Sequence, residues 1–346
     1  MPSTYTRVTY CTAALIVATL ASIAPAGDPV SVLWTAPALD RWMYPFNATP
    51  GLRPTISTFG STPGAPEFDS RDGQMLIGFD VAGHLPPAGW PTEYNITAAR
   101  VVVQLSNSIA TYDNTLDAWQ CFVAASDPEY QADPDPGQPV ELHGVGYRGG
   151  FTLQTFVETS QYGFGSPLAQ GVRNAFALGA GSAGGSGFID ISNSPRDRFD
   201  PQPWAIGQVP AIQPGSLLTQ YSLMQFDINL AAPGVLDYLR ASIDGGSIRF
   251  ALSSFTSVVQ GGGNFPAFYA KENVEVALGI AQAAQLELSV TPMGPCGADI
   301  DCSGNVGGSD LALLLSGWGQ SGQADIDGNG VVEGTDLSLL LSNWGG

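Results

Sequence analysis

Residues 299–320 of this chain read DIDCSGNVGGSDLALLLSGWGQ, and residues 325–346 repeat the pattern as DIDGNGVVEGTDLSLLLSNWGG, with a period of 26 residues. Fourteen of the 22 aligned positions are identical, so the similarity does not arise by chance. Each copy joins an acidic, glycine-containing loop to a leucine-rich run. This pairing predicts the fold at the C-terminal end of the chain.

Each copy opens with the 12-residue pattern of a calcium-binding loop, in which oxygen donors alternate around a glycine at position 6. In the first loop the predicted ligands are Asp299, Asp301, Ser303, Asn305 (through its backbone carbonyl) and Asp310. In the second they are Asp325, Asp327, Asn329, Val331 (through its backbone carbonyl), Glu333 and Asp336. Hard oxygen donors and the lack of His favour Ca²⁺ over zinc, so two Ca²⁺ ions are expected.

A short helix is expected after each loop. Leucine and tryptophan recur at i, i+3, i+4 and i+7, which predicts one apolar stripe on each helix. The stripes are Leu311, Leu314, Leu315 and Trp318, and Leu337, Leu340, Leu341 and Trp344. Gly319 and Gly345 stand where C-terminal caps would fall. Residues 292–297 read PMGPCG and cannot form an incoming helix, so each unit is a loop plus one helix.

Tandem units of this kind resemble the type I dockerin module of secreted bacterial proteins, and the resemblance covers residues 296–346. It implies two packed helices, folding that depends on Ca²⁺, and docking onto a cohesin. The family often has Ser-Thr at loop positions 10 and 11, whereas this chain has Gly308-Ser309 and Gly334-Thr335. The expected partner is therefore a cohesin-like or other cell-surface protein. The alternative is a calcium-stapled end cap without a partner.

The charge of the chain restricts its partners. It has 12 Lys and Arg against 31 Asp and Glu, a net charge of −19, and Lys271 is its one lysine. Nucleic acids and anionic lipid surfaces require clustered basic residues, so neither is expected to bind. Residues 296–346 hold seven carboxylates and no Lys or Arg, so we expect their folding to be linked to metal binding.

Residues 1–26 have the pattern of a secretion signal. Arg7 precedes an apolar run at 8–24, and Ala24-Pro25-Ala26 is a cleavage pattern before Gly27. An uncleaved signal anchor is the alternative. No second apolar run of that length follows, so a secreted protein without a membrane span is expected. In an oxidising compartment Cys296 and Cys302 could form a short disulfide, which leaves Cys121 as a buried free thiol.

Residues 27–290 predict one mainly β domain, a jelly-roll-like β-sandwich, joined by a linker at 291–295 to the repeats. The 43 Gly and 26 Pro, with 44% hydrophobic residues, favour short strands and many turns. Strands are expected at 74–81, 96–106, 118–124, 151–158, 223–230, 247–254, 272–278 and 285–290. A helix is expected at 234–243.

This β domain lacks a recognisable catalytic motif. His84 and His143 are expected in loops, and no G-x-S-x-G elbow accompanies them. A glycoside hydrolase needs two facing carboxylates, and most glutamates here are expected to be solvated. The candidates are Glu67, Glu93, Glu141, Glu158, Glu272, Glu275 and Glu287. The chain is therefore expected to be non-catalytic, and a glycoside hydrolase acting on polysaccharides if it is an enzyme.

Aromatic side chains are the remaining candidates for binding, because flat rings can stack on sugars. Core packing is the commoner role of such residues. Trp90 and Trp204 lie in loop-like sequence and are the better candidates for an exposed platform. The first interpretation is a secreted structural or interaction protein that docks through its calcium module. The alternative is a carbohydrate-binding or polysaccharide-degrading protein that uses the module as an anchor.

Overall fold

The computed structural model describes residues 30–65, 67–85, 94–163, 172–180, 188–258, 262–292, 297–301, 303, 305–327 and 329–345. The predicted signal at 1–26, Trp90, Glu93 and the cysteines Cys296 and Cys302 lie outside these residues. None of the helices in the described part of the chain is long and apolar enough to cross a bilayer.

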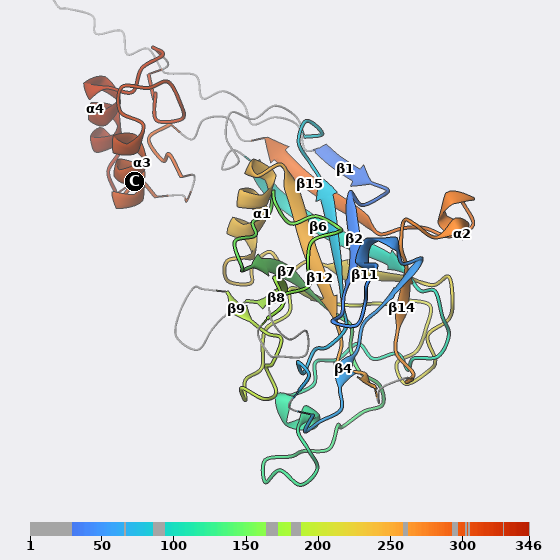
Figure 1. Cartoon of the computed structure of the whole chain (residues 1–346). Helices are drawn as coiled ribbons and strands as arrows, with labels where there is room; N and C mark the ends of the chain where they lie inside the picture. The colour runs from blue at the N-terminus through green and yellow to red at the C-terminus, as the bar shows by residue number, and fades with distance from the viewer. Residues whose placement is uncertain are drawn as a thin grey trace, which may run out of the picture.

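The body, residues 30–292, is mainly β and contains two large sheets (Figure 1). The four-stranded sheet has the order β1 (Val30–Trp34), β15 (Gln285–Pro292), β6 (Tyr94–Gln104) and β11 (Leu223–Asp227). The seven-stranded sheet has the order β2 (Leu39–Met43), β5 (Gln74–Asp80), β12 (Ser247–Ser253), β7 (Glu141–Tyr147), β8 (Ala175–Gly179) and β9 (Ile189–Asp190), with β10 (Ala205–Ile206) beside β7. All pairs within both sheets are antiparallel.

Short elements complete the body. The strand β13 (Ser257–Val258) pairs with β4 (Gly60–Ser61), and β14 (Ala267–Tyr269) pairs with β3 (Thr55–Ser57). The helices among the described residues of the body are η1 (Pro50–Leu52), η3 (Trp119–Phe122), α1 (Val235–Asp244) and α2 (Val274–Ala277). They connect or cover strands, so the sheets determine the architecture.

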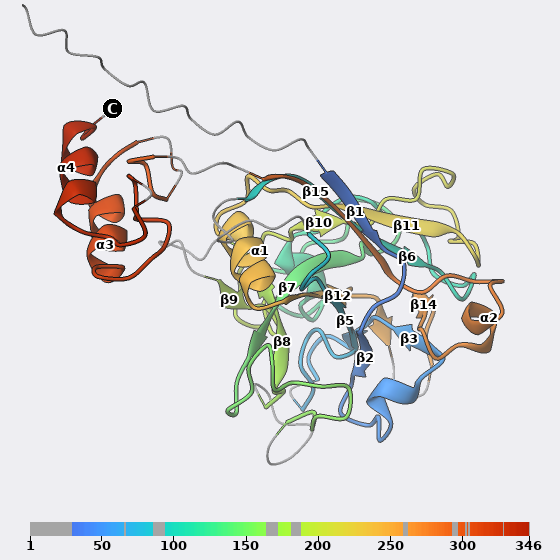
Figure 2. The ribbon, with the colours of Figure 1, turned by 90° about the horizontal axis from the view of Figure 1, so that it is seen from above.

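One hydrophobic core joins the two large sheets. Val101 and Leu286 of the four-stranded sheet belong to the same buried cluster as Ile77 and Phe250 of the other sheet. Leu239 of α1 adds to this cluster. The sheets therefore pack face to face, and the body is β-sandwich-like. Figure 2 shows the two layers from above, with α1 beside the strands.

The seven-stranded sheet is covered on its second face as well. There Leu76, Val145 and Ala251 pack against Phe156, which comes from the irregular segment after β7. Burial on both faces explains why β5 is a continuous apolar run instead of an alternating one.

Most of the stronger strand predictions are confirmed. The predictions at 74–81, 96–106, 223–230, 247–254 and 285–290 correspond to β5, β6, β11, β12 and β15, and the helix at 234–243 corresponds to α1. The predicted strand at 272–278 is wrong. It forms α2, because Asn273 caps the helix by accepting a hydrogen bond from the backbone N–H of Glu275 at 2.8 Å.

Two further strand predictions are wrong because side chains bind the backbone groups that a sheet would use. At 118–124 the chain forms η3, and the backbone N–H of Trp119 donates to Asp200 at 2.6 Å. At 151–158 the chain turns irregularly, and the carbonyls of Val157 and Phe156 accept hydrogen bonds from the buried Arg41 and Arg249.

The central strand β7 escaped prediction because it contains two glycines, which are poor strand formers. Gly144 is required there, since a Cβ atom would lie 2.2 Å from the ring of Trp204. Trp204 is fully buried, so its proposed role as an exposed platform is wrong. His143 is also wrong as a loop residue, because it lies in β7 and is fully buried.

The repeats, residues 297–345, form α3 (Gly308–Ser316) and α4 (Gly334–Ser342), which confirms a helix after each loop. Their shared core contains equivalent residues of the two copies, such as Ile300 and Ile326, and Leu314 and Leu340. The two ends bond reciprocally. The N–H of Gly319 donates to Val332 of the second loop, and that of Gly345 donates to Val306 of the first, both at 2.9 Å. Both glycines have φ near +78°, in the left-handed region that favours glycine. The C-caps themselves are Gly317 and Asn343, so the predicted capping positions are wrong by two residues.

The predicted apolar stripes divide into two parts. Leu314 and Leu340 are fully buried between the helices, whereas Trp318 and Trp344 are 46% and 47% exposed. Leu315 and Leu341 are also exposed. Only part of each stripe therefore serves the core of the repeats.

Candidate metal centres and a pocket in the body

Each repeat gathers three carboxylates. Oxygen atoms of Asp299, Asp301 and Asp310 all lie within 4.8 Å of one another, and so do those of Asp325, Asp327 and Asp336. These are positions 1, 3 and 12 of the two predicted calcium loops. The other predicted ligands, Ser303, Asn305, Asn329, Val331 and Glu333, are exposed on the same loops.

The carboxylate at position 12 shapes each loop and starts the following helix. Asp310 accepts hydrogen bonds from the backbone N–H groups of Asp301 at 3.0 Å and Gly307 at 2.7 Å. Asp336 accepts the equivalent bonds from Asp327 at 3.0 Å and Glu333 at 2.8 Å. Burial opposes the charge of Asp336, but backbone N–H donors outweigh it and lower the pKa of this carboxyl. It is therefore an anion at neutral pH.

The centre of each loop turns the remaining carboxylates inward. The backbone N–H of Ser303 donates to both Asp299 and Asp301 at 3.0 Å. In the second loop the N–H of Asn329 donates to Asp325 at 3.0 Å and to Asp327 at 3.1 Å. The φ of Gly330 is +96°, which confirms that position 6 of this loop requires a glycine. Its counterpart Gly304 lies outside the described residues.

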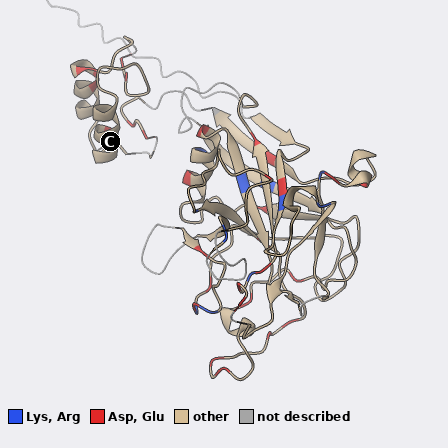
Figure 3. Ribbon diagram, in the orientation of Figure 1, with Lys and Arg blue, Asp and Glu red and all other residues tan. Residues whose placement is uncertain are grey.

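The electrostatics of the repeats favour a cation. Figure 3 shows acidic residues and no basic ones on the ribbon of α3, α4 and their loops. Hydrogen bonds to Ser303 and Ser309 overcome burial and lower the pKa of Asp301, so its charge is also retained. A divalent ion would bring these repelling oxygens together, and carboxylates at this spacing are the ligands that Ca²⁺ prefers.

In comparisons with known proteins, no family model and no curated protein matches this chain. The resemblance of the repeats to dockerin modules therefore depends on their sequence motifs alone.

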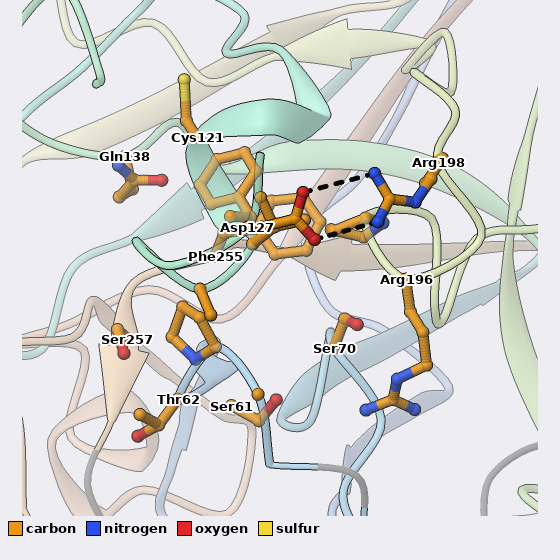
Figure 4. A pocket seen from close by; sticks show the side chains of 16 residues that line it. Ser61, Thr62, Ser70, Cys121, Asp127, Gln138, Arg196, Arg198, Phe255 and Ser257 are labelled. Carbon is orange, nitrogen blue, oxygen red and sulfur yellow. Dashed lines mark hydrogen bonds and ion pairs between the residues drawn. The ribbon is translucent and has the colours of Figure 1, made fainter. Parts of the chain in front are cut away.

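The body contains a pocket of about 410 Å³ between β4, η3 and the segment around Arg198 (Figure 4). Phe122 and Phe255 line it and stack with their ring centroids 4.0 Å apart. On one wall Arg198 pairs with Asp127 at 2.9 Å. Among the described residues that line this pocket, Asp127 is the one carboxylate. The pocket thus combines an aromatic surface with polar groups, without a facing pair of acids.

Behind this pocket lies a buried chain of charges. The guanidinium carbon of Arg71 is 3.8 Å from the Phe255 ring centroid, and its Nη1 is 2.6 Å from Glu141 Oε2. The same oxygen is 2.9 Å from Nε2 of His143. Burial opposes ionisation of Glu141, but Arg71 and His143 outweigh it and lower its pKa to about 2. Burial also lowers the pKa of His143. Glu141 was expected to be solvated, and this expectation is wrong.

A second charged cluster surrounds the lysine. Nζ of Lys271 lies 2.9 Å from Asp40 and 2.7 Å from Glu272, and it also contacts Glu158. Burial raises the pKa of Asp40 to about 7, although Lys271 opposes the shift. Glu158 and Glu272 therefore belong to an ion-pair network, contrary to the expectation of solvated carboxylates.

The other candidates are dispersed. Glu67 is exposed but lines a pocket of about 220 Å³ together with Asp72, whose pKa burial raises to about 7. Glu287 is exposed on β15, and His84 is exposed in a turn as expected. Cys121 is a free thiol at the larger pocket and only partly buried, which corrects its expected place in the core. Burial raises its thiol pKa, so it is a poor nucleophile.

Proposed function

We propose that this chain is a secreted, non-catalytic interaction protein. In this proposal residues 27–290 form a jelly-roll-like β-sandwich. Residues 296–346 form a dockerin-like module that binds two Ca²⁺ ions and docks onto a cohesin-like or other cell-surface protein. The observation that carries the proposal is the convergence of three carboxylates in each repeat, within a segment that has no Lys or Arg.

The exposed apolar side chains of α3 and α4 support a docking role. Trp318 and Trp344 occupy equivalent positions of the two repeats, and about half of each side chain is accessible. Leu315 and Leu341 add to this apolar surface. A surface of this kind is typical of a protein-binding site and costs solubility when it stays uncovered. An end cap without a partner gives no reason for it.

The test measures calcium binding and docking on the same full-length chain. Calorimetric titration should show Ca²⁺ binding that is lost when Asp299, Asp310, Asp325 and Asp336 are all replaced by Ala. Type I cohesin domains immobilised on a sensor should then capture the chain in Ca²⁺ and release it in chelator. A Trp318→Ala, Trp344→Ala double variant should lose capture while still binding Ca²⁺. The exposed aromatic Tyr130 of the body gives the matched control, Tyr130→Ala.

Two results would overturn this proposal. One is calcium binding that survives unchanged in the variant with four Ala substitutions. The other is failure of both cohesin domains and bacterial cell-surface fractions to capture the chain in Ca²⁺, since docking would then have no support.

A carbohydrate-binding or polysaccharide-degrading body is the second candidate. The larger pocket favours it through its stacked Phe122 and Phe255. The smaller pocket adds two carboxylates, Glu67 and Asp72, of which Asp72 has the raised pKa of a potential acid. Incubation of the full chain with a panel of polysaccharides should measure retention and released reducing sugar together. Retention that Phe122→Ala abolishes would support binding, and sugar release that Asp72→Asn abolishes would support hydrolysis.

A further inference from the structure

The body contains an acidic cluster that neither the repeats nor the pocket explains. Asp113 and Asp117 come from the loop after β6, and Asp135 comes from the Asp-Pro-Asp-Pro-Gly turn at 133–137. One carboxylate oxygen from each of the three lies within 4.8 Å of the other two. Asp113 and Asp117 are only 3% and 8% exposed. Two separate loops therefore bring three acids together, two of them buried and Asp135 partly buried.

The hydrogen bonds around this cluster leave its oxygens unsatisfied. Oδ1 of Asp113 accepts from the backbone N–H and lies 2.8 Å from the hydroxyl of Thr115. The same hydroxyl is 3.0 Å from Oδ2 of Asp135, but it has only one proton to donate. Oδ2 of Asp113, Oδ2 of Asp117 and Oδ1 of Asp135 are buried and have no hydrogen-bond partner. Buried carboxylate oxygens without donors are costly, so they point to a missing ligand.

Amide oxygens extend the same pattern. Oε1 of Gln120 and Oε1 of Gln138, from the segments that follow the two loops, are also buried without a partner. The amide nitrogen of Gln138 donates to Asp133 at 2.7 Å, and this bond fixes the side chain beside the turn. The neighbourhood is thus rich in acceptors and poor in donors, which is the reverse of an anion site.

None of the ion pairs found among the described residues includes Asp113, Asp117, Asp133 or Asp135. Burial first, and then the neighbouring carboxylates, raise the pKa of Asp117 to about 7. The cluster around Lys271 differs, because a cation of the chain itself stands among those carboxylates. An acid cluster of similar spacing without such a cation is neutralised by protonation or by a cation from solution, and the unpartnered buried oxygens offer the cation its ligands.

We propose that Asp113, Asp117 and Asp135 bind a Ca²⁺ ion in the body, at a site separate from the repeats. Hard carboxylate and amide oxygens are the ligands of this ion, and the unpartnered amide oxygens of Gln120 and Gln138, from the adjoining segments, are candidates to complete its coordination. The ion would fasten the start and the end of the segment from η3 to Gln138. Residues of that segment, including Phe122 and Asp127, form a wall of the larger pocket, so the ion would hold that wall in place.

The test counts Ca²⁺ ions on the full-length chain by native mass spectrometry. The chain should bind three ions, and the variant with Ala at positions 299, 310, 325 and 336 should still bind one. Adding Asp117→Asn to that variant should remove the last ion. Asp133→Asn is the matched control, because its two oxygens already accept hydrogen bonds from Asp135 and Gln138. It should keep the ion. Because the repeat sites are absent here, failure of the function proposed above would not affect this result.

Two results would overturn the inference: no ion on the variant with four Ala substitutions, or an ion that persists after Asp117→Asn. If Asp117→Asn prevents folding, the unmodified chain still gives an answer. Crystals grown in millimolar Ca²⁺ should show an anomalous difference peak between Asp113, Asp117 and Asp135. A featureless map at that position would overturn the proposal without any variant.

Discussion

The body and the repeats differ in how the charge of their carboxylates is neutralised. In the body Arg71 pairs with Glu141, Arg173 with Asp69, and Lys271 with Asp40, so these three buried acids are neutralised within the chain. The repeats bring three carboxylates together twice and contain no Lys or Arg. The body therefore supplies cations of its own to several of its buried acids, whereas the repeats have none and, in our proposal, take ions from solution.

The clusters of three carboxylates show this difference between body and repeats most clearly. Among the described residues four groups of three carboxylates are close enough to share an ion. One of them, formed by Asp40, Glu158 and Glu272, already surrounds Lys271. The other three are the proposed Ca²⁺ sites. The presence of an internal cation, more than the number of acids, separates the two kinds of cluster.

Among these variants, Glu141→Gln should lower the free energy of unfolding most, and by the same amount with and without calcium. It leaves the charge of Arg71 buried without a partner, which costs about 4 kcal/mol of unfolding free energy. Glu287→Gln is the control, because this exposed glutamate lies 3.9 Å from Arg100 and should cost less than about 1 kcal/mol. Urea denaturation in Ca²⁺ and in chelator measures both. Equal costs for the two variants would contradict an internally neutralised body.

The stabilising contribution of Glu141 should depend on pH in a defined direction. The folded-state pKa of Glu141 is about 2, below the ordinary value, so its stabilising contribution is complete above about pH 4.5 and is lost as the pH falls toward 2. The unmodified chain should therefore lose its advantage over Glu141→Gln in that window. An advantage that stays constant down to about pH 2 would contradict the assignment.

Asp336→Ala should have the next largest effect, and only when calcium is present. It removes a predicted ligand and the acceptor for the N–H groups of Asp327 and Glu333 at the start of α4. We expect a loss of about 3 kcal/mol in Ca²⁺ and little change in chelator. Helical circular dichroism during a calcium titration measures it. Ser342→Ala, which removes an exposed hydroxyl of the same helix, should titrate like the unmodified chain.

Lys271→Met converts a body cluster to the type found in the repeats. It removes the cation from Asp40, Glu158 and Glu272, at a cost of about 2 kcal/mol, because the lysine is partly exposed. Ca²⁺ should recover part of this loss by entering the vacated cluster. Arg100→Met, at an exposed pair, should show no such recovery. A cost for Lys271→Met that is the same with and without Ca²⁺ would break the comparison.

Asp72→Asn, unlike the other variants, should stabilise the fold, and it should do so only at the higher pH. Burial raises the pKa of Asp72 to about 7, so its ionisation destabilises the fold increasingly as the pH rises from about 4 to 7. The variant should therefore be more stable than the unmodified chain at about pH 8, by at most about 4 kcal/mol, and similar to it near pH 4. Melting temperatures at the two pH values measure this, with the exposed Asp80→Asn as control. An equal gain at both values would contradict the cause.

The convergence of carboxylates in the two repeat loops was predictable because these residues are close in sequence. Positions 1, 3 and 12 of one loop converge through local turns, and Asp299 and Asp310 reveal their relationship by spacing alone. The helices followed from the leucine period. The sequence did not predict which residues of each apolar stripe are buried. Leu314 and Trp318 belong to the same stripe, and only the packing of the two helices makes one buried and the other exposed.

The charged clusters of the body could not be predicted from sequence spacing, because they form between residues that the fold brings together from distant positions. Arg71 and Glu141 are 70 positions apart, and the glycines of β7 concealed the strand that carries Glu141. No sequence motif links Asp113 to Asp135, which are 22 positions apart. Their convergence depends on the path of two loops, which a single sequence does not specify.

Hydrogen exchange of the full-length chain, followed by mass spectrometry, tests the central claim most directly. In Ca²⁺, peptides from the repeats and from the body should both be protected. In chelator, peptides covering α3 and α4 should exchange completely, while those covering β5 and β12 should keep their protection. Repeats that remain protected in chelator would contradict the account, because a segment with seven carboxylates and no Lys or Arg would then fold without ions from solution.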